Sequence, residues 1–510
     1  MMPVTPSSQP PADSSSSDEC YFATDHLNRD LRARSIQGGR VSLVAQFVKF
    51  VITVGTTAIL ARILTPDEFG VVAMVLAFTS IAGSFRDMGL TTATVQSSTV
   101  DHHQVSALFW INVLFGLLLC AVTAALSPVI ALFYDDARVV AITVVFSTSF
   151  AIAGLGSQHQ ALLRRQMRFP AIAAINTGSA AFSSALAIAL ALEGAGYWAL
   201  VAMHIGLMLG VTVGCWTACR WRPGPPARVA GLRSLLSFGG HLAGVSFLTA
   251  LTRVVDKILL GFATGARQVG LYNRSYNLLV VALTQVAEPI TIVAVAAMSR
   301  IRNEHAAYRS FFRKGTLFYL SLTVPFIAFS LVSAEALVYT LLGNQWTTSI
   351  SVVRLLSPAA LIVVFKVPLA WVYFSNGQSR RQFLWSLYTA PVVFLLLAAG
   401  MRWGASGVAS ALSAGFLITG LPELPYCFRT VCVRVSDFAQ ALWRPALSSM
   451  LAAFAVHLAL LTVTAELASG IRLLIELFGF SLIYLLCWLS LPGGVSLAKE
   501  ALNLRRENPR

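Results

Sequence analysis

Eight basic side chains lie within stretches of sequence that otherwise read as apolar, membrane-spanning helices. They are Arg40, Lys49, Arg86, Arg253, Lys257, Arg274, Arg354 and Lys366. A cation at the centre of a bilayer costs roughly 3 kcal/mol on insertion scales, so these side chains are not expected to face lipid. We predict that they line a wet, positively charged cavity, which is a place for an anionic ligand.

Two acidic residues in the same stretches could bind a proton or a sodium ion. Asp256 lies between Arg253 and Lys257, and Glu288 directly precedes Pro289. Arg253 and Lys257 are four residues apart, so they share one helical face, on which Asp256 can pair with Arg253. That face stays net positive after the pairing. Asp256 and Glu288 are therefore the candidate ion-coupling residues.

Some of the eight basic side chains can be explained without a cavity. Arg40, Arg86 and Arg274 lie near predicted span ends, where long side chains can extend to the lipid headgroups. The cavity is favoured for the residues that lie deeper, which are Lys49, Arg253, Asp256, Lys257 and Lys366. Glu423, between Pro422 and Pro425, reads as structural.

The composition is that of an integral membrane protein. Hydrophobic residues make up 56% of the 510 residues and charged residues only 12%, with a mean hydropathy of +0.72. The net charge of +15 comes from short clusters of Lys and Arg between apolar runs, and this scatter argues against nucleic-acid binding.

Motifs for catalysis, metals or cofactors are absent from the sequence. There is no GxxxxGK[ST] loop for ATP, and neither DxD nor HExxH occurs. The seven cysteines lack paired loop spacing, and Cys215 and Cys219 have no nearby His or carboxylate in sequence. We therefore predict no catalytic residue, no metal, no cofactor and no disulfide framework.

A membrane span needs about 20 apolar residues. Polar segments divide the apolar sequence into fourteen runs of about this length, which are the predicted spans. Their ranges are 37–64, 69–90, 105–126, 139–161, 169–192, 197–218, 235–263, 269–298, 311–333, 348–374, 382–400, 405–427, 445–465 and 473–496. With the N-terminus inside, the inner segments hold twenty-four Lys and Arg and the outer loops five. This bias predicts that both termini are cytoplasmic.

The sequence contains a weak internal repeat. GGRVSLVAQF at Gly38 matches GGHLAGVSFL at Gly239, and Gly70 in DEFGVV matches Gly270 in RQVGLY. An even number of spans separates the two copies, so both halves enter the membrane from the same side. This indicates a parallel repeat with a cleft between the halves.

Three segments resemble the polysaccharide-biosynthesis flippases of the MOP superfamily, of the Wzx and WzxC type that exports exopolysaccharide and O-antigen units. They are DEFGVVAMVLAFTSIAGSFRDMGLTTATVQ (67–96), DKILLGFATGARQVGLYNRSYNLL (256–279) and YTLLGNQWTTSISVVRLLSPAA (339–360). The likeness covers nearly all of residues 36–435.

The resemblance implies an all-α polytopic membrane protein with two parallel six-helix bundles in a V and two further C-terminal helices. The expected division begins with a disordered cytoplasmic tail (1–35), a first six-helix bundle (36–220) and a cytoplasmic linker (221–234). It continues with a second bundle (235–435), two additional spans (436–498) and a short cytoplasmic tail (499–510).

The implied substrate is an oligosaccharide linked to a polyprenyl (undecaprenyl) diphosphate. It would be flipped across the bacterial inner membrane among membrane lipids, with a polysaccharide polymerase and export machinery as candidate partners. The family supplies no invariant catalytic set, so the site residues rest on charge placement.

Three other functions stay open at this point. A cation or drug antiporter of the MATE branch would share the fold, but carboxylates should lead its site. A membrane glycan polymerase or ligase would usually carry a long outer loop with catalytic residues, whereas every outer connection here is short. A scaffold that transports nothing would gain nothing from the cost of buried charge.

Overall fold

The structure is a computed structural model that describes residue 22 and residues 31–86, 90–96, 100–226, 250–462 and 468–494. Within these ranges every regular element is helical and no strand occurs. The helices up to residue 218 are α2 (Leu31–Ile63), α3 (Pro66–Gly83), α4 (Leu90–Gln96), α5 (His102–Ala125), α6 (Ser127–Tyr134), α7 (Arg138–Arg165), α8 (Phe169–Leu192) and α9 (Trp198–Ala218).

The helices of the remaining chain begin with residues 250–264, which are helical without a break. They continue with α11 (Ala266–Tyr276), a π-helical turn (Asn277–Val281), α12 (Ala282–Arg300), α13 (His305–Val332), α14 (Ala334–Leu341), α15 (Thr348–Ser375), α16 (Ser379–Gly400), α17 (Gly404–Gly420), α18 (Glu423–Phe428), α19 (Val435–Thr462) and α20 (Ser469–Ser490).

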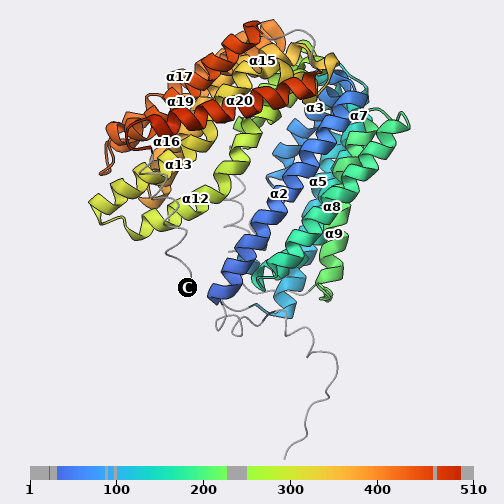
Figure 1. The fold of residues 1–510 in the computed structure, drawn as a ribbon. Helices are drawn as coiled ribbons and strands as arrows, with labels where there is room; N and C mark the ends of the chain where they lie inside the picture. The colour runs from blue at the N-terminus through green and yellow to red at the C-terminus, as the bar shows by residue number, and fades with distance from the viewer. Residues whose placement is uncertain are drawn as a thin grey trace, which may run out of the picture. The chain divides into compact units, whose positions relative to one another are not determined.

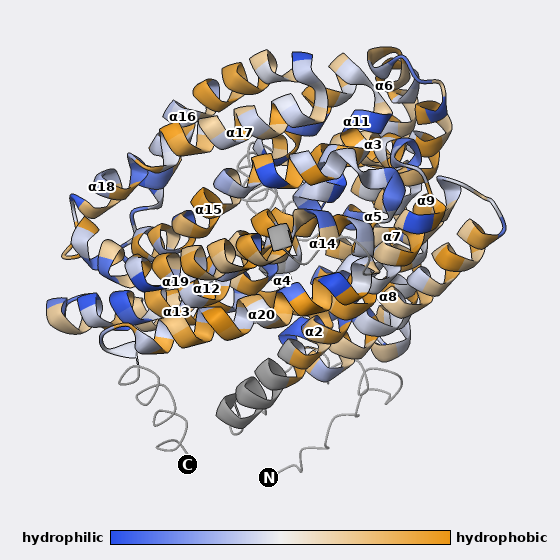
Figure 2. Ribbon diagram, turned by 45° about the horizontal axis from the view of Figure 1, so that its top comes forward, coloured by the Kyte–Doolittle hydropathy of each residue, from blue (hydrophilic) through white to orange (hydrophobic). Residues whose placement is uncertain are grey.

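Eleven helical segments in the described part of the chain are long and apolar enough to cross a membrane. One of them, Ser379–Phe428, includes a 3₁₀ turn at Met401–Trp403 and covers two predicted spans. Apolar residues dominate the long helices (Figure 2), and Phe478 on α20 is 73% exposed, as a lipid-facing side chain would be. The all-helical, membrane-spanning class is confirmed, whereas the number fourteen stays a prediction.

The first compact unit comprises residues Met1–Ile63 and Val75–Val254. Its long helices α2, α5, α7, α8 and α9 lie side by side in Figure 1, with α8 packed against α2 and α9, and α7 against α5 and α9. At one end of the unit, Trp221 packs with Phe109 of α5 and Leu162 of α7 in a fully buried cluster. This unit is a helical bundle.

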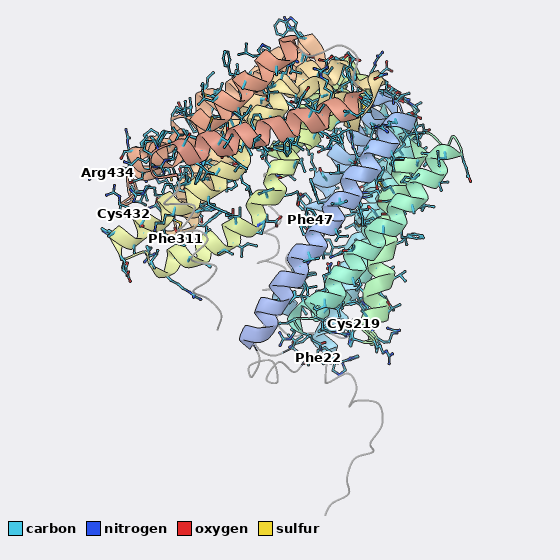
Figure 3. All side chains as sticks on the ribbon, in the orientation of Figure 1. Phe22, Phe47, Cys219, Phe311, Cys432 and Arg434 are labelled. Carbon is cyan, nitrogen blue, oxygen red and sulfur yellow. The ribbon has the colours of Figure 1, made fainter. Side chains whose placement is uncertain are left out.

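One residue of the predicted disordered tail belongs to this packing. Phe22 contacts the buried cluster near Cys219 (Figure 3), and its carbonyl oxygen accepts a hydrogen bond from Arg165 Nε at 3.4 Å. Helix α2 begins at Leu31, within the range 1–35. Phe22 and the first turn of α2 thus lie within the range 1–35, for which the disordered tail stays a prediction.

The second compact unit comprises residues Leu64–Met74 and Val255–Arg510. Helix α15 is its centre and packs against α11, α12, α13 and α17. Helices α19 and α20 join the same unit through a cluster in which Phe329 of α13 and Leu337 of α14 meet Val456 and Phe480. The two additional C-terminal helices are thus part of this unit. One of its boundaries lies between Val254 and Val255, within helix 250–264. The division at the linker 221–234 stays a prediction.

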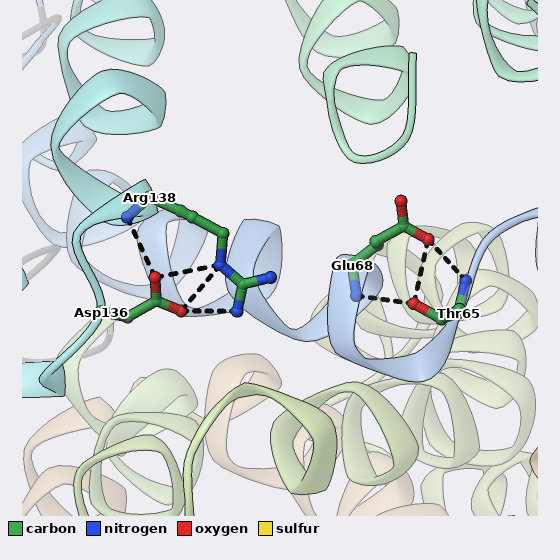
Figure 4. Close-up of polar contacts among 4 residues, drawn as sticks. All are labelled: Thr65, Glu68, Asp136 and Arg138. Atoms are coloured by element: carbon green, nitrogen blue, oxygen red, sulfur yellow. Dashed lines mark hydrogen bonds and ion pairs between the residues drawn. The ribbon is translucent and has the colours of Figure 1, made fainter. Parts of the chain in front are cut away.

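Helix α3 begins within the second unit, at a capping box that fixes its start. Thr65 N donates to Glu68 Oε2 at 2.8 Å, and Glu68 N donates to Thr65 Oγ1 at 3.4 Å (Figure 4). Pro66 occupies the first helical position, where its missing N–H costs nothing. In the first unit, Arg138 binds Asp136 at the start of α7 in a similarly local contact, at 2.7 Å (Figure 4).

The two glycines that the sequence repeat paired, Gly70 and Gly270, face each other where α3 crosses α11. A β-carbon on Gly70 would overlap the carbonyl oxygen of Ala266, and one on Gly270 would overlap that of Pro66. Only glycine lets two helix backbones approach this closely. This contact places the first turns of α3 in the second unit.

Replacing Gly270 with alanine should lower the stability of the protein by about 1–3 kcal/mol or more, because the added methyl group has no space beside Pro66. The measurement is the midpoint of thermal unfolding in detergent. Gly479→Ala on α20 is the matched control, since no atom lies within 4 Å of its added β-carbon. Equal midpoints for the two variants would contradict the assigned crossing.

Candidate functional site

The predicted site residues divide between the two compact units. Arg40, Lys49, Arg86 and Arg253 belong to the first, and Asp256, Lys257, Arg274, Glu288, Arg354 and Lys366 belong to the second. Three contacts in the second unit engage these residues, and each is at a different place. Their common membership of one cationic cavity stays a prediction.

Asp256 and Lys257 form the first of these contacts, between helix 250–264 and α11. The Asp256 carboxylate, only 5% exposed, accepts a hydrogen bond from Tyr272 Oη at 2.7 Å and one from Lys257 N at 2.9 Å. The Lys257 ammonium lies 3.8 Å from Asp256 Oδ1 and 4.9 Å from the centre of the Tyr276 ring. A tyrosine hydroxyl and a lysine therefore hold this buried carboxylate.

A π-helical turn follows directly after this cluster. Residues Asn277–Val281 separate α11 from α12, although the helix continues without a break from Ala266 to Arg300. Such turns widen the helix and often lie at functional sites. Glu288 lies further along α12, exposed and just before Pro289.

Arg274 lies at the crossing of α3 and α11, within the second unit. Its guanidinium stacks over the ring of Phe69 at 4.5 Å, and Phe69 also meets Trp346 edge-on at 5.4 Å. Arg274 Nε is buried without a hydrogen-bond partner among the described residues. The contact with an aromatic face stabilises this cation, so Arg274 contributes to packing at the crossing.

Lys366 and Glu423 form the third contact, between α15 and α18. The Lys366 ammonium lies 3.4 Å from Glu423 Oε2 and 5.4 Å from the centre of the Phe416 ring on α17. The Glu423 side chain is almost fully buried, whereas 35% of the Lys366 side chain is exposed. The sequence singled out both residues but did not pair them.

The other predicted residues are placed by their helices. Lys49 is half-buried on α2, and Arg86 is half-buried in the turn after α3, close enough to His204 for an electrostatic interaction. Arg253 and Arg354 are exposed on helix 250–264 and α15. Arg40 lies within α2, and its side chain is outside the described residues.

Tyr272 and Tyr276 are the site residues that the sequence reasoning missed. Their spacing of four residues places them on one face of α11. That signal is weak, because aromatic pairs at helical spacing usually serve only packing. In the described residues, no group of three or more His, Cys, Asp or Glu side chains could hold a metal ion.

Replacing Tyr272 with phenylalanine should destabilise the protein by about 1–3 kcal/mol, because the Asp256 carboxylate loses its buried hydroxyl donor. Unfolding in detergent provides the measurement. The same substitution at Tyr388, which is 73% exposed, is the matched control and should leave the midpoint unchanged. If Tyr272→Phe matches this control, the hydroxyl does not hold the carboxylate.

The chain is similar to known proteins over most of its length. It is 24% identical to the teichuronic acid biosynthesis protein TuaB of Bacillus subtilis (strain 168), over 88% of this chain and 94% of that protein. It is also 24% identical to the lipopolysaccharide biosynthesis protein WzxC of Escherichia coli (strain K12), over 87% of this chain and 89% of that protein.

Its fold is similar to that of the lipid II flippase MurJ in an inward closed conformation. The TM-score is 0.70 at 14% sequence identity, and the match covers 88% of this chain and 97% of that one. The family model "Polysaccharide biosynthesis protein" matches residues 59–351, more than half of the chain. The protein therefore belongs to the polysaccharide biosynthesis protein family.

Proposed function

We propose that this protein flips a lipid-linked oligosaccharide, carried on undecaprenyl diphosphate, from the cytoplasmic to the outer leaflet of the bacterial inner membrane. The observation that carries the proposal is that, in a chain of this family, the basic residues Lys49, Arg274, Arg354 and Lys366 lie on helices long and apolar enough to span a membrane. The names of the relatives TuaB and WzxC, which refer to teichuronic acid and lipopolysaccharide, support a cell-surface polysaccharide as the end product.

The chemistry of the basic side chains suits a lipid diphosphate. The diphosphate loses hydration when it enters the membrane, and Lys or Arg can replace that water with charge-assisted hydrogen bonds. Arginine can contact two phosphate oxygens at once, which favours Arg86, Arg253 and Arg354 for this role. Two six-helix bundles in a V, rocking against each other, would open the cationic cavity to each leaflet in turn.

Protein partners and orientation form part of the same proposal. We place both termini in the cytoplasm, because the inner segments hold most of the Lys and Arg. A polysaccharide polymerase and the export machinery would receive the flipped unit. No chemical bond is made or broken in this step, so we propose a transporter and not an enzyme.

The carboxylates of the second unit favour this function over a cation antiporter. Asp256 is engaged by Tyr272 and Lys257, and Glu423 is paired with Lys366. A site that binds cationic drugs needs carboxylates available to the ligand, whereas here each of these carboxylates already has a basic neighbour. Glu288, exposed on α12, stays the candidate for ion coupling along with Asp256.

Complementation of a bacterial strain that lacks its exopolysaccharide flippase tests the function. The wild-type protein should restore polymer, whereas Lys49→Ala, Arg253→Ala and Lys257→Ala should reduce it about tenfold or more at matched membrane expression. Lys314→Ala, at an exposed position on α13, is the control and should restore polymer fully. Failure of the wild type in hosts with different repeat units, together with resistance to cationic drugs, would instead indicate an antiporter.

Thiol labelling tests the wet cavity independently of transport. Cysteines introduced at Lys49 and Arg253 should react with a membrane-impermeant, water-soluble reagent in everted vesicles. A cysteine at Phe478, which is exposed on the apolar helix α20, should react slowly, because lipid would cover it. The cavity proposal fails if positions 49 and 253 react no faster than position 478.

A further inference from the structure

We propose that Glu423 is a resident counter-anion, which neutralises Lys366 while no substrate is bound and takes up a proton when a substrate phosphate displaces it. Lys366 would then exchange one anionic partner for another and would never lie unpaired within the membrane. This inference rests on the proposed function, since it assumes an anionic, phosphate-bearing substrate. It adds Glu423, as a proton-binding residue, to the cationic site of which Lys366 was predicted to be a member.

The ion pair between Lys366 and Glu423 is long and weakly held. The Lys366 ammonium and Glu423 Oε2 are 3.4 Å apart, and Oε2 receives no hydrogen bond of good geometry from the described residues. The ammonium also lies over the Phe416 ring, and the stem of Lys366 runs beside Gly420, where an added β-carbon would be 3.5 Å from Cε. About a third of the Lys366 side chain is therefore exposed, and its contact with the carboxylate is long.

Other buried carboxylates of the described chain are held more firmly. Asp437 accepts three hydrogen bonds, two from Arg309 at 3.0 and 2.9 Å and one from Arg434 N at 2.8 Å. Asp256 accepts two of the same quality, at 2.7 and 2.9 Å. Multiple short bonds fix a carboxylate in place, whereas the single long contact of Glu423 can be exchanged.

Among the residues that the structure describes, Lys366 is the one basic partner of Glu423. From α15 these groups are Lys366 and Tyr373, and on α18 itself Cys427 faces the carboxylate. Helix α17 carries no titratable side chain.

More distant groups are engaged elsewhere. On α16, Arg381 donates to the carbonyl of Tyr426 and to Thr430. On α19, Asp437 is held by Arg309 of α13, Arg444 donates to the carbonyl of Pro492, and His457 is exposed.

Loss of Lys366 would leave a buried, unpaired carboxylate, which is strongly unfavourable. Glu423 would then take a proton from the aqueous phase and become a neutral acid, while Lys366 forms its new ion pair with the phosphate. Substrate binding and proton uptake are therefore linked. Because a lower pH favours protonated Glu423 and so frees Lys366, the affinity for the substrate should rise as the pH falls.

The experiment measures binding of undecaprenyl diphosphate to the purified full-length protein in nanodiscs at pH 6 and pH 8, with undecaprenol as the uncharged comparison. The wild type should bind the diphosphate about tenfold more weakly at pH 8 than at pH 6. Glu423→Gln removes the competing charge at nearly constant shape, so it should bind tightly at both values. Glu335→Gln, which alters another glutamate that pairs at 3.3 Å with Arg472, should behave as wild type.

Two outcomes overturn the inference. One is a Glu423→Gln affinity that changes with pH as the wild-type affinity does. The other is a wild-type protein that binds the diphosphate without taking up a proton, measured with a pH indicator in weakly buffered solution, which needs no variant. A wild type that binds undecaprenol and its diphosphate equally would contradict the proposed function itself.

Discussion

A charged side chain among apolar helices must be paired or neutralised, because burial of an isolated ion costs far more than the fold can supply. The second unit satisfies this constraint in three ways. Asp256 is held by a tyrosine hydroxyl and a lysine, Arg274 lies on the face of Phe69, and Lys366 faces Glu423. The helices that carry these residues are packed so that each charge meets its partner.

The sequence alone predicted the fold class, and its internal repeat marked two glycines that the structure brings into contact. Runs of about 20 apolar residues are typical of membrane-spanning helices, so composition and length predict such helices well. Gly70 and Gly270 lie at nearly the same distance from the starts of the two repeat copies, which pointed to equivalent positions, and the structure brings these glycines into backbone contact. The reason is physical: where two helix backbones cross this closely, only glycine fits, and a required glycine can be recognised in the sequence.

The partners of the charges could not be predicted, because pairing within one helix is the only geometry that spacing reveals. Spacing suggested Arg253 as a partner for Asp256, which stays a prediction. It could not suggest Tyr272, which lies sixteen residues further along on the next helix and donates to the carboxylate. Glu423 read as structural because two prolines flank it, and its contact with Lys366 depends on how α18 packs against α15. Tertiary packing, which no local pattern encodes, decided these partners.

The quality of each pair indicates its role. A carboxylate such as Asp437, with three short hydrogen bonds, fixes the position of α13 relative to α19 and gains nothing from release. A pair with one long contact and a partly exposed cation contributes little to stability, and burial of its carboxylate is a continuing cost. Under the proposed exchange of anionic partners, this cost has a functional benefit. A membrane protein that moves an anionic group needs cations that can change partners, and Lys366 is held in the way that this requires.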